Sequence, residues 1–207
     1  MAEDRGALMA AEIAEQPEAL ARLLVPEALD PVREIVGTIR ERSPRFVLLA
    51  ARGTSDHAAL YAKYLVEVSL GLPAGLASPS TMTAYGARPN LSDVLLLTVS
   101  QSGGSPDLVE TVRTARAGGA TTLAVTNNPG SAIAAASELH LDVLAGPERA
   151  VAATKSYSSQ LLALWLLIDA YRGGDMSAAK GIPESARSLV ERGEAVEALA
   201  ARYRFTD

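Results

Sequence analysis

Small polar residues are concentrated in the segment Ser100-Gln-Ser-Gly-Gly-Ser105, which directly follows the apolar run 94–99. Pro106 suits the first position of a helix and Ser105 its N-cap, so the segment leads into a predicted helix over 106–117. Backbone N–H groups and the dipole at such a helix end favour an anion, and hydroxyls add donors without charge. The segment is therefore predicted to hold a phosphate group. The alternative is that it only caps the helix, because turns favour the same residues.

A second segment of this kind, Gly53-Thr54-Ser55, follows the apolar run 46–50 and precedes a predicted helix over 56–70. Two such loops side by side would hold a phosphate and the sugar hydroxyls next to it. Nucleotide binding is disfavoured, because no G-x-G-x-x-G follows the first predicted strand and no G-x-x-x-x-G-K-[ST] occurs in the chain.

The elements that must position these loops are short apolar strands alternating with longer helical segments. Strands are predicted at 46–50, 74–77, 94–99, 121–125 and 139–143. This alternation predicts a three-layer α/β/α fold of the flavodoxin-like type, with a five-stranded parallel sheet covered on both faces. Ligands of such sheets bind beyond the carboxyl ends of the strands, where the predicted polar loops lie.

Further helices are predicted on both sides of this alternating region. They cover 12–24 (with Pro17 in an early turn or at a break), 30–42, a short segment after 130, 156–171 and 184–203. We expect an N-terminal helical segment at 1–45, a ligand-binding domain at 46–175, and a C-terminal helix at 176–207 that starts a linker to a second domain. The last residues, 202–207, are interpreted as the approach to another strand.

The composition excludes several classes of function. The chain of 207 residues has no cysteine, which rules out disulfides, thiolate metal sites and a cysteine nucleophile. A net charge of −5 without a basic stripe, and only 4% aromatic residues, argue against nucleic acid and membrane surfaces as partners. The acidic N-terminus is unlike a signal peptide, and the apolar runs are too short to span a bilayer. We therefore expect a cytoplasmic protein.

Neither a metal ion nor another cofactor is predicted. The two histidines, His57 and His140, lack metal-ligand spacing, and structural or solvent-facing roles are expected for both.

Five motifs in order resemble the sugar isomerase (SIS) domain family, and within it the first SIS domain in the isomerase half of the glucosamine-6-phosphate synthases. They are Glu12-Ile-Ala-Glu-Gln-Pro17, Arg52-Gly-Thr-Ser55, Ser100-Gln-Ser-Gly103, Asn127-Asn-Pro-Gly-Ser131 and Ala152-Ala-Thr-Lys155. The sequence departs from the family pattern at Arg52, Gly104 and Ala153, where cysteine, glutamate and serine are usual. These departures suggest a relative that handles a different sugar derivative.

The resemblance implies which residues bind a sugar phosphate. By it, Ser100, Gln101, Ser102, Gly103 and Ser105 hold the phosphate, Gly53, Thr54 and Ser55 bind the sugar end, and Val151 and Ala152 line the pocket, Val151 through its backbone. Aldose–ketose isomerisation needs a positioned base, which two-domain members of the family take from their second SIS domain. In this chain Glu148 and Lys155 are the catalytic candidates, although charged loop residues are usually only solvated.

The resemblance thus implies the sugar-phosphate-binding half of an aldose–ketose isomerase, or of an aminosugar aminotransferase or deaminase, acting on a hexose phosphate such as fructose 6-phosphate or glucosamine 6-phosphate. One alternative is a non-enzymatic sugar-phosphate sensor within a transcription regulator. Another is an isomerase with one SIS domain that completes its site across a dimer interface. A homodimer is expected because relatives usually pair.

Overall fold

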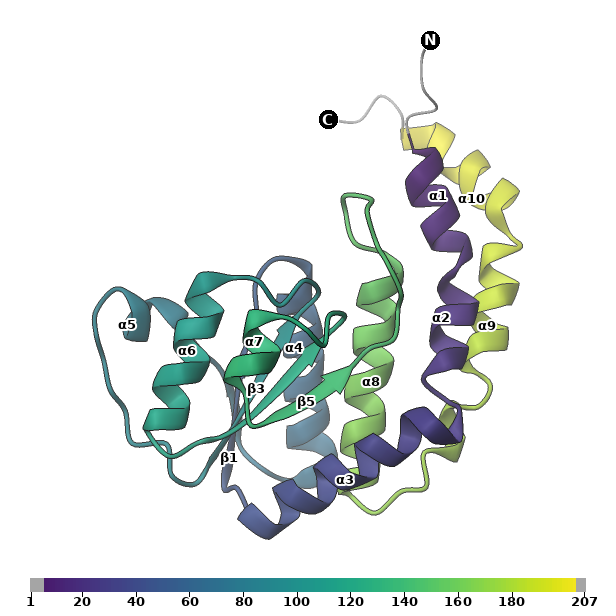
Figure 1. The fold of residues 1–207 in the computed structure, drawn as a ribbon. Coiled ribbons are helices and arrows are strands. Elements are labelled where there is room, and N and C mark those ends of the chain that lie inside the picture. Colours follow the sequence, from purple (N-terminus) through teal and green to yellow (C-terminus); the bar gives the residue numbers. More distant parts are fainter. Residues whose placement is uncertain (1–5, 204–207) are drawn as a thin grey trace.

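The computed structural model describes residues 6–203 and contains one parallel five-stranded sheet (Figure 1). Its strands are β1 (Phe46–Ala50), β2 (Ala74–Leu76), β3 (Val94–Ser100), β4 (Thr121–Thr126) and β5 (Leu139–Asp142). They lie in the order β2-β1-β3-β4-β5, and every neighbouring pair is parallel. The α/β/α fold class predicted from the alternating pattern is confirmed.

Helices cover both faces of the sheet, as the near-continuous apolar sequence of β3 and β4 requires. One face carries α3 (Pro26–Arg42), α4 (Thr54–Leu65) and α8 (Lys155–Tyr171), and its core contains Leu97, Val125 and Leu164. The other face carries α5 (Pro79–Thr83), α6 (Pro106–Ala117) and α7 (Ala132–Ala136), and its core contains Leu96 and Leu108. Successive residues of β3, such as Leu96 and Leu97, therefore enter opposite cores, as the pleat of a strand demands.

Several helix boundaries differ from the expectations. Helix α3 begins at Pro26, four residues before the predicted start, because proline is well suited to the first turn. The predicted helix over 56–70 starts earlier, at Thr54, and its last turn, Val66–Leu70, is π-helical and ends at the left-handed Gly71. The short helix α5 was not predicted.

The predicted N-terminal helix is two helices. Helix α1 (Ala7–Ala14) ends at Glu15, and α2 (Gln16–Arg22) begins directly after it, with Pro17 in its first turn. The expectation that Pro17 marks an early turn or a break is confirmed, since proline cannot donate the hydrogen bond that would continue α1.

The predicted C-terminal helix over 184–203 is wrong as a single element. The chain forms a 3-10 turn at Ser177–Ala179, then α9 (Ile182–Val190), α10 (Gly193–Ala200) and a last 3-10 turn at Ala201–Tyr203. The break falls just before Gly193, where a helix interior would pay the high entropy cost of glycine. Helices α1 and α2 run beside α9 and α10 at the edge of the sheet domain (Figure 1). The predicted approach to another strand lies largely outside the described residues.

Candidate functional site

The two predicted ligand loops leave the sheet at the point where the strand order reverses. From β1 the chain adds β2 on one side and β3 on the other, and the helices that follow β1 and β3, α4 and α6, cover opposite faces of the sheet. Ala50, the last residue of β1, is paired with Thr98, two residues before the end of β3. The structure therefore brings the loop before α4 and the loop before α6 together at one edge.

An ion pair ties these two loops to each other. Nε and Nη2 of Arg52 lie 2.6 and 2.5 Å from Oδ2 of Asp107, in the first turn of α6. Both side chains reach solvent, so the pair stands at the mouth between the loops. Arginine here, in place of the family's usual cysteine, thus links the two segments.

The loop between β3 and α6 has a conformation that requires glycine. Gly103 has φ +64°, and a Cβ added to it would lie 2.2 Å from Oγ of Ser131. The N–H of Gly103 donates to Oγ of Ser100 (3.1 Å), while the N–H of Gly104 approaches Oγ of Ser102 at 3.4 Å. This tight turn buries Ser100 and leaves Ser102 exposed to solvent.

The predicted cap of α6 is only half correct. Ser105 occupies the N-cap position, but its side chain makes no capping hydrogen bond. Its hydroxyl is therefore not used by the helix terminus. Pro106 has no N–H, and the N–H of Leu108 donates to Oδ1 of Asp107 (3.0 Å). The donors suited to an anion are therefore mainly the hydroxyls of Ser102 and Ser105.

The residues predicted to bind the sugar end lie at the start of α4, and they differ in burial. Gly53 has φ 59° and ψ −134°, Thr54 is exposed, and Ser55 is buried at 7% exposure. Oγ of Ser55 accepts a hydrogen bond of 3.1 Å from Nε2 of the buried Gln160 on α8. Thr54 therefore faces solvent, whereas Ser55 joins α4 to α8.

Asn127, which sequence analysis placed in a motif but gave no role, links three loops. Its N–H donates to the carbonyl of Gln101 (3.1 Å). Its side-chain Nδ2 donates to the carbonyl of Gly146 (2.7 Å), and its Oδ1 accepts from the N–H of Ala145 (2.9 Å). The loops after β3, β4 and β5 are thus held in a fixed relation by one residue, through its backbone N–H toward the first and its side chain toward the last.

Glu148, one of the two catalytic candidates, is engaged in holding its own loop. Its carboxylate accepts hydrogen bonds from the N–H of Thr154 (2.8 Å), the N–H of Ser156 (3.2 Å) and both hydroxyls of these residues. Burial is the largest single influence on the pKa of Glu148 and raises it, but the hydrogen bonds from Ser156 and Thr154 together outweigh it and leave the pKa below its usual value. The carboxylate is thus stabilised as an anion, which is unfavourable for a general acid.

Lys155, the other candidate, was expected in a solvated loop. In the structure it is instead the first residue of α8. Its side chain is almost fully buried, and its Nζ lies 2.5 Å from a carboxylate oxygen of Glu15. A buried lysine needs such a partner to remain charged. Val151, in the loop before it, is 93% exposed, and Ala152 is exposed as well.

His57 is exposed on α4, and His140 on β5 places Nε2 2.8 Å from Oγ1 of Thr126. Burial lowers the pKa of His140, and the nearby Asp142 only partly opposes this. Among residues 6–203 no cluster of three or more side chains suited to a metal ion occurs, and no helix there is long and apolar enough to cross a membrane.

Comparisons with known proteins all point to one family. The profile of the SIS domain matches residues 42–170. Glutamine–fructose-6-phosphate aminotransferase (isomerizing) of Symbiobacterium thermophilum is 41% identical over 169 residues, which are 77% of this chain and 27% of that enzyme. The chain therefore spans only about a quarter of the length of this curated relative.

Solved structures share the fold. A protein of Silicibacter pomeroyi DSS-3 described as a "putative phosphosugar isomerase" has a TM-score of 0.83 and 40% identity, covering 87% of this chain and 55% of its own. The NanR protein of Vibrio vulnificus, solved with ManNAc-6P, has a TM-score of 0.63 and 17% identity, covering 96% of this chain and 70% of its own. At that identity the second likeness shows the fold alone.

Proposed function

Since this chain belongs to the SIS domain family, we propose that it binds the phosphate of a hexose phosphate at the loop 100–105 and the sugar end at the loop 53–55. The observation that carries the proposal is the position of these two loops on either side of the reversal in strand order. Ligands of open parallel sheets bind at such a point. The glycine turn at Gly103 and the uncommitted hydroxyl of Ser105 support a phosphate at this place.

The ligand that we propose is fructose 6-phosphate or an aminosugar phosphate derived from it. The support is the 41% identity with an aminotransferase whose name contains fructose 6-phosphate. The chain covers about a quarter of that enzyme, so the reaction itself remains part of the proposal. Because Glu148 and Lys155 are both used in holding the fold, we assign this chain the binding role in an isomerase, aminotransferase or deaminase.

Thermal unfolding of the chain with fructose 6-phosphate, glucosamine 6-phosphate or inorganic phosphate tests the proposal. A ligand at a hundredfold excess over its dissociation constant adds about 2.7 kcal/mol, which corresponds to a rise in Tm of roughly 5–10 °C for a chain of this size. The rise with a hexose phosphate should be lost in Ser102→Ala and kept in Ser185→Ala, a serine on the surface of α9. No rise with any sugar phosphate in the wild-type chain would refute the proposed function.

A sugar-phosphate sensor within a regulator is the second candidate, and the fold shared with NanR bound to ManNAc-6P favours it. Binding to duplex DNA that weakens with added salt would distinguish such a sensor from one half of an enzyme. Adding ManNAc-6P to the same unfolding experiment, beside fructose 6-phosphate, shows which of the two sugar phosphates the chain binds.

A further inference from the structure

The loop between β5 and α8, residues 143–154, is fastened to the N-terminal helices by charged side chains. Arg22 of α2 donates from Nε to the carbonyl of Leu144 (2.8 Å) and from Nη2 to that of Ala145 (3.0 Å). Farther along the loop, the carboxylate of Glu12 accepts the N–H of Arg149. Just after the loop, Glu15 pairs with Lys155 at the start of α8. We call Glu12, Glu15 and Arg22 the N-terminal latch.

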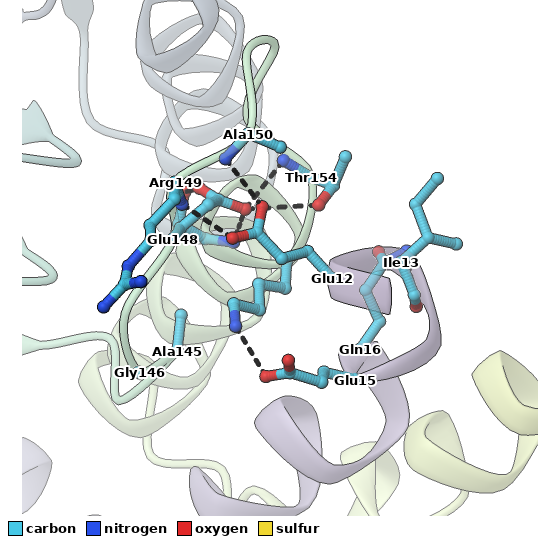
Figure 2. Close-up of polar contacts among 12 residues, drawn as sticks. Glu12, Ile13, Glu15, Gln16, Ala145, Gly146, Glu148, Arg149, Ala150 and Thr154 are labelled. Carbon is cyan, nitrogen blue, oxygen red and sulfur yellow. Dashed lines mark hydrogen bonds and ion pairs between the residues drawn. The ribbon is translucent and has the colours of Figure 1, made fainter. Parts of the chain in front are cut away.

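Glu12 makes the central contact of the latch (Figure 2). Its carboxylate is buried, at 3% exposure, and accepts the N–H of Arg149 (2.6 Å) and the N–H of Ala150 (3.0 Å). A buried carboxylate is costly unless hydrogen bonds compensate for lost water, and these two amides supply them. The same contact satisfies two loop amides that no strand or helix uses.

The latch acts through polar contacts rather than through an apolar interface. Glu12 is the only buried residue of α1, while Leu8 and Ile13 of the same helix are 50% and 38% exposed. Helix α1 therefore gains little from packing. Its buried contact with the sheet domain is the carboxylate of Glu12 on the loop.

The two amides held by Glu12 immediately precede Val151 and Ala152, the predicted lining of the pocket. Glu148 fixes the loop on one side by bonding to Thr154 and Ser156, and Lys155 fixes the start of α8 through Glu15. Between these points Glu12 determines the path of the backbone that enters Val151. Both Val151 and Ala152 are exposed, so their own side chains do not hold that path.

We propose that Glu12 is a positioning residue for sugar-phosphate binding: it presents the backbone of Val151 and Ala152 to the ligand without touching the ligand. The proposal rests on the proposed function, since it assumes that a sugar phosphate binds beside this loop. Glu12 belongs to a segment outside residues 42–170 that match the SIS domain profile. The binding site would thus depend on a residue from outside the part of the chain that matches the SIS domain profile.

The test is calorimetric titration of fructose 6-phosphate into the wild-type chain, Glu12→Gln and Glu18→Gln, at a temperature where all are folded. Glu18→Gln is the matched control, because Glu18 lies on α2 and pairs with Arg187 of α9 instead of the loop. We expect Glu12→Gln to bind about tenfold more weakly, a change of about 1.4 kcal/mol. Glu18→Gln should bind like the wild type. Equal affinity in all three chains would overturn the proposal while leaving the proposed function intact.

Amide hydrogen exchange separates positioning from a general loss of stability. In Glu12→Gln the amides of Arg149 and Ala150 should exchange faster, while amides of β3 exchange as in the wild type. If β3 exchanges faster as well, Glu12→Asp decides, since it keeps the charge but shortens the reach, and wild-type affinity in that folded variant would overturn the proposal. If the wild-type chain itself binds no sugar phosphate, the proposed function fails and this proposal fails with it.

Discussion

At the scale of single residues, the candidate site contains a position where only glycine fits, because neighbouring atoms leave no room for a Cβ. Gly103 shows this most directly, because its left-handed φ and its approach to Ser131 both exclude a Cβ. The carbonyl of Gly103 also accepts the N–H of Ile133 (3.0 Å), so the turn is joined to the start of α7. A side chain at this position must move either the loop 100–105 or α7.

Gly103→Ala should destabilise the chain by roughly 1–3 kcal/mol, from the clash with Ser131 and the strained φ. Gly193→Ala is the control, since nothing lies within 4 Å of a Cβ there and its φ is not left-handed. In the helix α10 alanine should be neutral or stabilising by up to about 1 kcal/mol. Urea denaturation measures both, and equal stability of the two variants would contradict the geometry described for the turn.

Glu148 predicts a dependence of stability on pH. Its folded pKa lies below the usual value of 4.5, so the unfolded chain binds this proton more readily. The stabilisation is complete above that usual value and is lost as the pH falls through the lower, folded pKa. Urea denaturation at a series of pH values from 7 down to about 3 should show a smaller acid loss in Glu148→Gln than in the wild type. Equal acid losses in the two chains would disprove this role.

At the scale of elements, the loops at the carboxyl ends of the strands are held in place by contacts with one another and with the neighbouring helices. Asn127 joins the loops after β3, β4 and β5, Gln160 of α8 reaches Ser55 at the start of α4, and Arg52 reaches Asp107 of α6. Each of these contacts joins two elements that leave the sheet separately. The positions of the ligand loops are therefore coupled.

Asn127→Ala should cost about 1–3 kcal/mol, because it leaves the carbonyl of Gly146 and the N–H of Ala145 without their partner. Asn128→Ala is the matched control in the same loop, where the exposed side chain accepts only the N–H of Gly130 (3.1 Å). Its loss should be distinctly smaller. Denaturant unfolding compares the two, and a larger loss in Asn128→Ala would contradict the role of Asn127.

The strands and most helices could be predicted from sequence because their signals are local. The continuous apolar run of β3 and the proline at the start of α6 lie within the elements that they define. The contacts that shape the site have no such signal: Glu12 and Arg149 are 137 residues apart, and Ser55 and Gln160 are 105 apart. The burial of Lys155 was missed for the same reason, since its partner Glu15 lies 140 residues earlier, between α1 and α2. The resemblance placed the motifs in order but not the bonds between them.

At the scale of the whole molecule, the chain consists of the sheet domain and a group of helices beside it. Helices α1 and α2 pack along α9, and α9 and α10 contain no buried residue among those described. The group is joined to the sheet domain through the β5–α8 loop and the buried face of α2. Any movement of these helices would therefore displace both that loop and the packing of α2 on α8.

The ion pair between Arg52 and Asp107 has a consequence for the way in which a charged ligand arrives. Since the guanidinium at the mouth already faces a carboxylate, and the chain carries a net charge of −5, a dianion meets no long-range attraction. Its capture would rely on diffusion and on short-range dipoles at the loop. Affinity for fructose 6-phosphate should therefore stay level, or rise slightly, between about 20 and about 300 mM sodium chloride, as screening weakens the repulsion. A steep fall would reveal an unpaired cation that steers the ligand. A level affinity would instead mean that the molecule selects anions by shape and hydrogen bonding rather than by charge, at the cost of a slower encounter.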